Sequence, residues 1–97
     1  MPIRMESYMV RNEGLLSAPA DDELVILNLP ADNYLALDDI GRRIWELLET
    51  PRRVDELCRQ LSQEYVAASD QIAVDVLPFL AELEKENMIH VVGSPGG

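Results

Sequence analysis

The sequence predicts an α+β fold in which antiparallel strands in the first third of the chain precede three helices. Before residue 38, short runs rich in leucine and β-branched residues alternate with turn residues; after it, apolar residues recur at helical spacing. With 97 residues, 47% of them hydrophobic and 27% charged, the chain has the composition of one globular domain. We expect this domain over residues 1–92 and a flexible tail over residues 93–97.

A β-hairpin is the first element expected. Glu23–Leu29 has the length and composition of a strand, residues 30–33 supply turn chemistry, and Tyr34–Leu37 returns with Leu35 and Leu37 on one face. Asn12–Asp22 is expected to be turn-rich. Two further candidate strands are Ser7–Arg11 and Met88–Val92.

Three helices with apolar stripes follow. Asp38 is expected to cap a helix over Asp39–Glu49. Thr50 and Pro51 are a start signal for a second helix that runs to about Tyr65. Ser69 or Asp70 is expected to cap a third helix, Gln71 to about Asn87, in which Pro78 should kink or loosen the helix near Val74. The residues assigned to the core stripes include Ile40, Ile44, Trp45, Leu47, Leu48, Val54, Leu57, Cys58, Leu61, Ile72, Val76, Phe79, Leu80 and Leu83.

Charge and hydropathy exclude several classes of partner. A net charge of −10 repels phosphate backbones and anionic membrane surfaces. No apolar run approaches the ~20 residues that span a bilayer, and residues 1–11 lack the apolar centre of a signal peptide. We therefore expect a cytoplasmic protein that binds neither membrane nor nucleic acid.

The sequence contains no recognisable catalytic constellation. Cys58 falls in an apolar helical stripe, where a buried thiol is ordinary, and His90 has no Cys or Ser near it in sequence. The acidic runs at residues 21–23 and 38–39 lack calcium-loop spacing and suit turns and caps. We expect no enzymatic activity, no metal and no cofactor.

Two other classes of function remain open. Strands followed by helices are also typical of a winged-helix DNA-binding regulator, although the third helix carries five acidic residues against Lys85 alone. A structural scaffold or homodimer, including a strand-swapped form through Asn12–Asp22, is the third alternative.

The ordered strings from residue 23 to residue 92 resemble the PqqD family, also called the RiPP recognition element. The first string is Val25–Leu29, a turn, and then Tyr34–Leu48, which reads YLALDDIGRRIWELL. The second is Pro51–Leu57 with Glu64-Tyr65, and the third is Asp75–Leu83. The resemblance implies a winged-helix-like fold with a three-stranded antiparallel sheet followed by three helices. Pro78 departs from the family pattern, in which Ala or a polar residue is common.

The resemblance also implies a site. In the family, the leader segment of a ribosomally made precursor peptide adds as a strand to the third strand and packs against the third helix. Carried over to this sequence, the strand residues are Tyr34, Leu35, Ala36 and Leu37, and those expected on the helix wall are Val74, Asp75, Pro78, Ala81 and Lys85. A proline or a charge at Ala36 or Ala81 should then weaken leader binding without unfolding the domain.

The family function implied is a peptide chaperone that presents a leader to a processing enzyme. The YLALDDIGRRIWELLE string favours a free-standing member of the lasso peptide type, whose partner is a leader peptidase. The alternative within the family is a protein of pyrroloquinoline quinone synthesis, whose partner is a radical enzyme.

Overall fold

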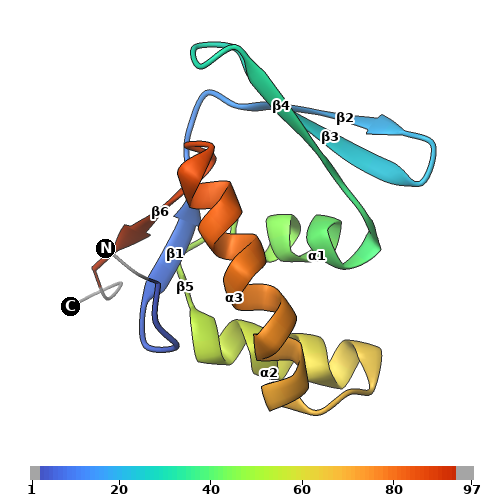
Figure 1. Cartoon of the computed structure of the whole chain (residues 1–97), viewed down its shortest axis with the longest axis vertical. Helices are drawn as coiled ribbons and strands as arrows, with labels where there is room; N and C mark the ends of the chain where they lie inside the picture. Colours follow the sequence, from blue (N-terminus) through green and yellow to red (C-terminus); the bar gives the residue numbers. More distant parts are fainter. Residues whose placement is uncertain (1–2, 94–97) are drawn as a thin grey trace.

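The computed structural model describes residues 3–93, which form two three-stranded antiparallel sheets and three helices (Figure 1). One sheet has the order β5-β1-β6, from Arg52–Arg53, Tyr8–Arg11 and Ile89–Val92. The other, which we call the hairpin sheet, has the order β2-β3-β4, from Leu16–Ala20, Glu23–Asn28 and Asn33–Leu37. The helices are α1 (Asp39–Leu47), α2 (Val54–Tyr65) and α3 (Ser69–Lys85). The predicted α+β class is confirmed; residues 94–97 of the expected tail lie outside the described residues.

The hairpin sheet differs from the expectation in its first strand. Asn12–Asp22 was expected to be turn-rich, but residues 16–20 of it form β2 and pair with β3 from Leu16↔Leu27 to Ala20↔Glu23. The small residues and Pro19 of β2 have low strand propensity, so the pairing with β3 supplies what the local sequence lacks. The expected strand at Ser7–Arg11 is present as β1, in the other sheet.

Only one of the three predicted helix caps is confirmed. The Asp38 carboxylate accepts a hydrogen bond of 3.0 Å from the Gly41 amide at the start of α1. Helix α2 begins at Val54 instead of Pro51, because residues 52–53 pair with β1 and the Val54 amide donates to the Ser7 carbonyl at 2.9 Å. The Thr50–Pro51 start signal is thus wrong: strand pairing overrides it.

Helix α3 begins two residues earlier than expected. Its N-cap is Ala68, with no side-chain cap, so the predicted cap at Ser69 or Asp70 is wrong. The helix continues through Pro78 to Lys85 without a break. The Glu86 and Asn87 amides close its last turn by bonding to the Glu82 and Glu84 carbonyls.

The hydrophobic core lies between the two sheets and the three helices. Trp45, Leu48 and Leu80 are almost fully buried, as predicted. Ile40, however, is 37% exposed, and Phe79 is only half-buried. Both were assigned to the core; they lie where α1 and α3 meet the surface, beside the hollows described below.

Two asparagines join the hairpin sheet to the end of α3. The buried Asn28 amide donates to the carbonyls of Glu86 and Asn87, both at 3.3 Å, and its oxygen accepts from the Ala31 amide. The Asn33 amide donates to the Glu86 carboxylate. These bonds set the position of β4 relative to α3.

None of the helices in residues 3–93 is both long and apolar enough to cross a membrane.

Candidate functional site

The hairpin sheet has one edge that another strand can join. Within the described residues β4 pairs with β3 alone, so alternate residues of β4 direct their amides and carbonyls away from the sheet. The opposite edge is β2, in which Pro19 has no amide hydrogen to donate. Strand addition is therefore favoured at β4.

A hollow of about 330 Å³ lies between the β4 edge and α3. Leu35, Ala36 and Leu37 line it from the strand, and Phe79 and Glu82 line it from the helix. Leu35 is half-buried and Leu37 is buried, so the strand side has an apolar floor.

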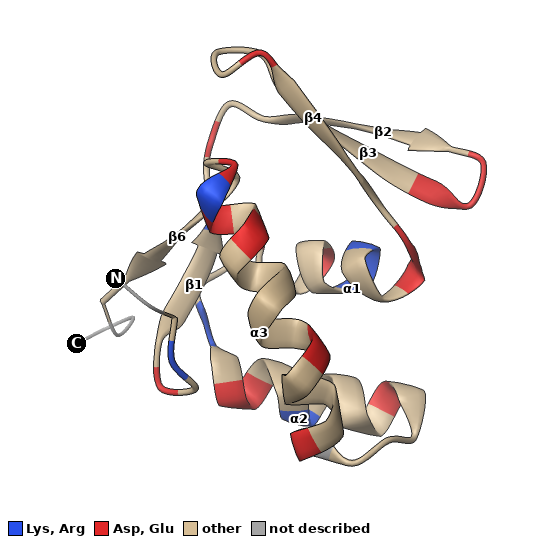
Figure 2. Ribbon diagram, viewed as in Figure 1, with Lys and Arg blue, Asp and Glu red and all other residues tan. Residues whose placement is uncertain are grey.

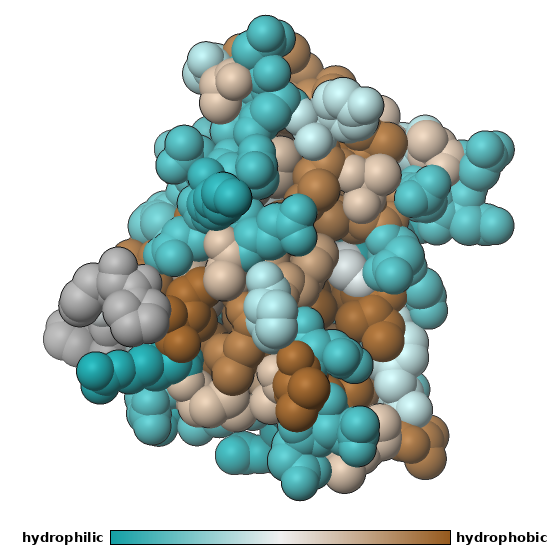
Figure 3. All heavy atoms as spheres, viewed as in Figure 1, coloured by the Kyte–Doolittle hydropathy of each residue, from teal (hydrophilic) through white to brown (hydrophobic). Residues whose placement is uncertain are grey.

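A second hollow, of about 250 Å³, continues from the first between α1 and α3. Ile40 and Ile44 line it from α1, while Asp75, Val76 and Phe79 line it from α3. The two hollows share Asp38 and Phe79, and we call them together the β4–α3 groove. Figure 3 shows apolar atoms along β4 and over α1, with hydrophilic atoms on either side.

Two sets of contacts hold the walls of the groove together. At one end the bonds from Asn28 and Asn33 hold the β3–β4 turn against the end of α3. Where the two hollows meet, Phe79 packs on Gly41, and a Cβ added to Gly41 would lie 3.1 Å from the Phe79 Cζ atom. An extended chain would therefore enter a largely preformed groove.

The margins of the groove are acidic. Glu23, Asp38, Asp75 and Glu82 line its two hollows, and no basic residue does. Figure 2 shows acidic segments on α3 and at the β4–α1 junction. Opposite charges attract more strongly at a partly desolvated groove than in bulk water, so this arrangement favours a guest chain with Lys or Arg beside its apolar residues.

The structure brings together some of the site residues expected from the sequence. Leu35, Ala36, Leu37 and Asp75 all line the groove. Tyr34 is 71% exposed and lines a separate small hollow with Leu27 and Leu29. The helix residues that are exposed and line neither hollow of the groove are Val74, Pro78, Ala81 and Lys85.

The sequence reasoning missed several groove residues. Ile40, Ile44, Val76 and Phe79 were assigned to the core, and Glu82 was not assigned to the site. Phe79 and Glu82, together with Asp75 and Glu86, occupy positions 75, 79, 82 and 86, a spacing that keeps them on one side of a helix. The expected positions 74, 78, 81 and 85 have the same spacing displaced by one residue, or about 100° of helical rotation.

Among residues 3–93, no group of three or more His, Cys, Asp or Glu residues is placed to hold a metal ion. Cys58 is buried, and burial raises the pKa of its thiol, which disfavours the reactive thiolate. His90 is exposed, and its Nδ1 atom contacts the Asn12 side-chain oxygen.

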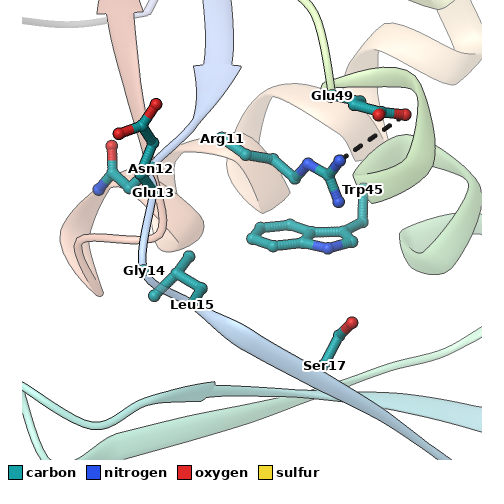
Figure 4. A pocket seen from close by; sticks show the side chains of 8 residues that line it. All are labelled: Arg11, Asn12, Glu13, Gly14, Leu15, Ser17, Trp45 and Glu49. Carbon is teal, nitrogen blue, oxygen red and sulfur yellow. Dashed lines mark ion pairs between the residues drawn. The ribbon is translucent and has the colours of Figure 1, made fainter.

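A further hollow of about 350 Å³ is lined by residues 11–15, Ser17, Trp45 and Glu49 (Figure 4). The Arg11 guanidinium lies over the Trp45 ring, 5.2 Å from its centroid, and is 3.9 Å from the Glu49 carboxylate. Stacking of Arg11 on this ring joins β1 to α1 through a cation–π contact. Arg11 contacts both Trp45 and Glu49, so these three side chains have a structural role in holding β1 against α1.

The fold and the groove define a small α+β domain with an open strand edge beside an apolar helical wall. The chain belongs to the PqqD family: the family described as coenzyme PQQ synthesis protein D (PqqD) matches residues 23–89. The predicted resemblance is thereby confirmed.

Two curated relatives are called PqqA binding protein. The one from Gluconobacter oxydans (strain 621H) is 43% identical over 87 residues, which cover 90% of this chain and 78% of the relative. The one from Rhizobium meliloti (strain 1021) is 27% identical over 90 residues, which cover 93% of this chain and 80% of the relative.

Two solved structures share the fold. TbiB1 in complex with the TbiA(beta) leader peptide has a TM-score of 0.75 and 30% identity, and the match covers 88% of this chain and 99% of TbiB1. The PqqD truncation of Methylobacterium extorquens PqqCD, described as a functional and stand-alone RiPP recognition element, has a TM-score of 0.77 and 21% identity over 91% of this chain and 94% of that chain. The winged-helix-like α+β arrangement expected from the resemblance is that of these proteins.

Proposed function

We propose that the chain binds the leader segment of a ribosomally made precursor peptide in the β4–α3 groove and presents it to a processing enzyme. The observation that carries the proposal is the open β4 edge facing the apolar, acid-margined wall of α3. A leader in an extended conformation adds to β4 through main-chain hydrogen bonds, which supply affinity for any sequence. Its alternate side chains enter the groove, which supplies selectivity.

The comparisons support the same guest. TbiB1, at 30% identity, was solved with a leader peptide, and two relatives are named for binding PqqA. On the helix wall we assign the contacts to Asp75, Phe79 and Glu82, because these residues line the groove. The two carboxylates are placed to attract a basic leader, and the Phe79 ring is placed to pack on its apolar side chains.

For the pathway we propose a precursor of the lasso peptide type with a leader peptidase as the partner enzyme, on the strength of the YLALDDIGRRIWELLE string. A PqqA-type precursor with a radical enzyme is the second candidate, favoured by the names of the two relatives. Fluorescence anisotropy with a labelled leader of a lasso peptide precursor and a labelled PqqA peptide separates the two. The guest that binds at least about tenfold more tightly, a difference of about 1.4 kcal/mol, is the cognate class.

Strand addition is tested by methylating the amides of the leader one at a time. Every second amide of an added strand bonds to β4, so N-methylation should weaken binding about tenfold or more at alternate positions and much less between them. An affinity loss without this alternation would contradict strand addition. The Ala36→Pro variant, which alters the edge itself, should also lose affinity while its thermal unfolding remains cooperative.

The wall assignment is tested by variants on the two registers of α3. Phe79→Ser and Glu82→Gln should weaken leader binding, and Glu82→Gln should also reduce its salt dependence, since it removes one charge from the margin. Val74→Ser and Lys85→Gln are the matched controls from the displaced register and should bind as the wild type. The opposite result would assign the wall to the positions first expected from the sequence.

A winged-helix DNA-binding role makes a different prediction. Helix α3 has Asp70 in its first turn and one basic residue, Lys85, in its last turn. Groove entry into DNA requires Lys and Arg to displace counterions from phosphates. A DNA shift that disappears with salt, in the absence of leader binding, would favour this role over the proposed one.

A further inference from the structure

The face of the hairpin sheet that points away from the helices is apolar and uncovered. Helix α1 packs against β3 and β4 on the inner face, where Ile26 and Leu37 are buried. Figure 1 shows α1 below the sheet and no helix above it. The outer face therefore has no partner among the described residues.

Two rows of cross-strand neighbours make up this outer face. The register aligns Leu16, Leu27 and Tyr34 in one row, and Ala18, Val25 and Ala36 in the next. Residues directly opposite one another in adjacent strands share a face of the sheet, so both rows are contiguous. Leu16 is 53% exposed, Leu29 in the following turn is 65% exposed, and Tyr34 is 71% exposed.

The outer face also has a recess. A hollow of about 130 Å³ lies between Leu27, Leu29 and Tyr34 and is bounded by the turn residue Asp32. In a strand with one solvent-exposed face, apolar side chains that point inward normally alternate with polar side chains that point outward. In β3 the outward-pointing residues Val25 and Leu27 are also apolar. Contiguous apolar surface with a recess is typical of a site that receives the side chain of another protein.

The charge around this face indicates what kind of protein it receives. Residues 12–41, which include the whole hairpin sheet, contain seven acidic residues and no basic ones. The acidic residues are Glu13, Asp21, Asp22, Glu23, Asp32, Asp38 and Asp39. Figure 2 shows acidic segments at both ends of the sheet. Two copies of the chain placed face to face would bring like charges together, whereas a partner with Lys or Arg around an apolar centre would be attracted.

We propose that the outer face of the hairpin sheet docks the processing enzyme, through an apolar patch on that enzyme surrounded by Lys and Arg. The proposal rests on the proposed function, because the enzyme is the one that acts on the precursor bound in the groove. The groove and the outer face meet at Ala36 and otherwise use different residues, so leader and enzyme can bind together. The chain then acts as an adaptor with two separate binding surfaces.

The test uses the purified chain, a labelled leader, and the purified enzyme whose reaction on the precursor depends on this chain. In Leu16→Ser the change lies on β2, two strands away from the groove edge. Its affinity for the enzyme should fall about tenfold or more, because serine removes an exposed apolar side chain from the proposed interface, while its affinity for the leader stays within about twofold. Val74→Ser, at a residue 68% exposed on α3, is the matched control and should bind both partners as the wild type.

A charge variant tests the basic margin. Asp21→Asn with Asp22→Asn should weaken enzyme binding about threefold and flatten its dependence on salt, whereas Glu56→Gln on α2 should change neither. Analytical ultracentrifugation of the chain alone gives its oligomeric state.

Three results would overturn the docking proposal. The first is that Leu16→Ser binds the enzyme as tightly as the wild-type chain does. The second is that the enzyme does not bind the wild-type chain. The third is a homodimer that Leu16→Ser dissociates, which would assign the face to a second copy. If the wild-type chain does not bind the leader, the proposed function is overturned instead. The separate leader titration thus distinguishes a failure of the proposed function from a failure of the docking proposal.

Discussion

Replacing Gly41 by alanine perturbs the point at which α1, α3 and β4 meet. An added Cβ would lie 3.1 Å from Phe79 Cζ and 3.3 Å from both Asp38 Oδ1 and Leu37 Cβ. These contacts are tighter than ordinary packing distances, and one of them involves the carboxylate that caps α1. The substitution therefore acts on the cap, the core and the groove together.

The magnitude follows from two opposing terms. Alanine in place of glycine inside a helix stabilises it by about 1 kcal/mol. Overpacking a well-filled site costs about 1–3 kcal/mol, and three close neighbours place Gly41→Ala near the middle of that range. We expect a net destabilisation of about 1 kcal/mol, which corresponds to a fall in Tm of about 4–8 °C for a domain of this size. Leader affinity should fall as well, because Phe79 must move and it lines both hollows of the groove.

The assay is thermal and urea unfolding of Gly41→Ala, Phe79→Leu and the double variant, with leader titration of each. If the Cβ meets the Phe79 ring, the smaller leucine relieves the contact, and the double-mutant cycle shows a favourable coupling of about 0.5 kcal/mol or more. Gly93→Ala, where an added Cβ meets nothing within 4 Å, is the control. A rise in Tm for Gly41→Ala, or strict additivity in the cycle, would refute this reasoning.

Further predictions concern the joint between sheet and helix, an ion pair and the buried thiol. Asn28→Ala should lower the free energy of unfolding by about 1–3 kcal/mol in urea titrations and weaken leader binding, because it removes the side-chain donor to the Glu86 carbonyl and one of the two side-chain donors to the Asn87 carbonyl; an unchanged midpoint would show that these bonds contribute little. A hydrogen bond from Arg43 lowers the pKa of Glu64 from 4.5 to about 2. The stabilisation that this ion pair gives the folded state is therefore present above pH 4.5 and lost as the pH falls toward 2. The Tm difference between the wild type and Glu64→Gln should shrink over that window and correspond at most to about 1 kcal/mol after solvent screening; a constant difference would argue against the pair. Cys58 should react with a thiol reagent on the order of a hundredfold more slowly in the folded protein than in urea, since burial both shields it and raises its pKa; equal rates would mean that the helix opens easily.

The local signals in the sequence predicted elements well where structure depends on neighbouring residues. Asp38 caps α1 because the carboxylate and the amide it accepts from are three residues apart, within reach of any short-range rule. Leu35 and Leu37 share the inner face of β4 because side chains alternate along every strand. Such features require no knowledge of the remaining chain.

The errors occurred where a distant segment decides the structure. Helix α2 begins late because residues 52–53 pair with β1, more than forty residues away in the sequence. Strand β2 exists because β3 pairs with a segment that contains Pro19 and has little intrinsic strand propensity. Similarly, periodicity defines the faces of α3 but does not say which of two adjacent faces meets β4; the bond between Asn33 and Glu86 does.

The proline on β2 also limits how far the hairpin sheet can grow. A sheet with two receptive borders can extend from molecule to molecule, as cross-β assemblies do. Here Pro19 occupies one border, so additions through this sheet stop after a single incoming segment at β4. If the β4 edges of two molecules paired with each other, both receptive edges would be used, and the assembly would stop at a dimer. If β4 receives the leader as proposed, this arrangement keeps the β4 edge available and prevents the chain from polymerising through the same sheet.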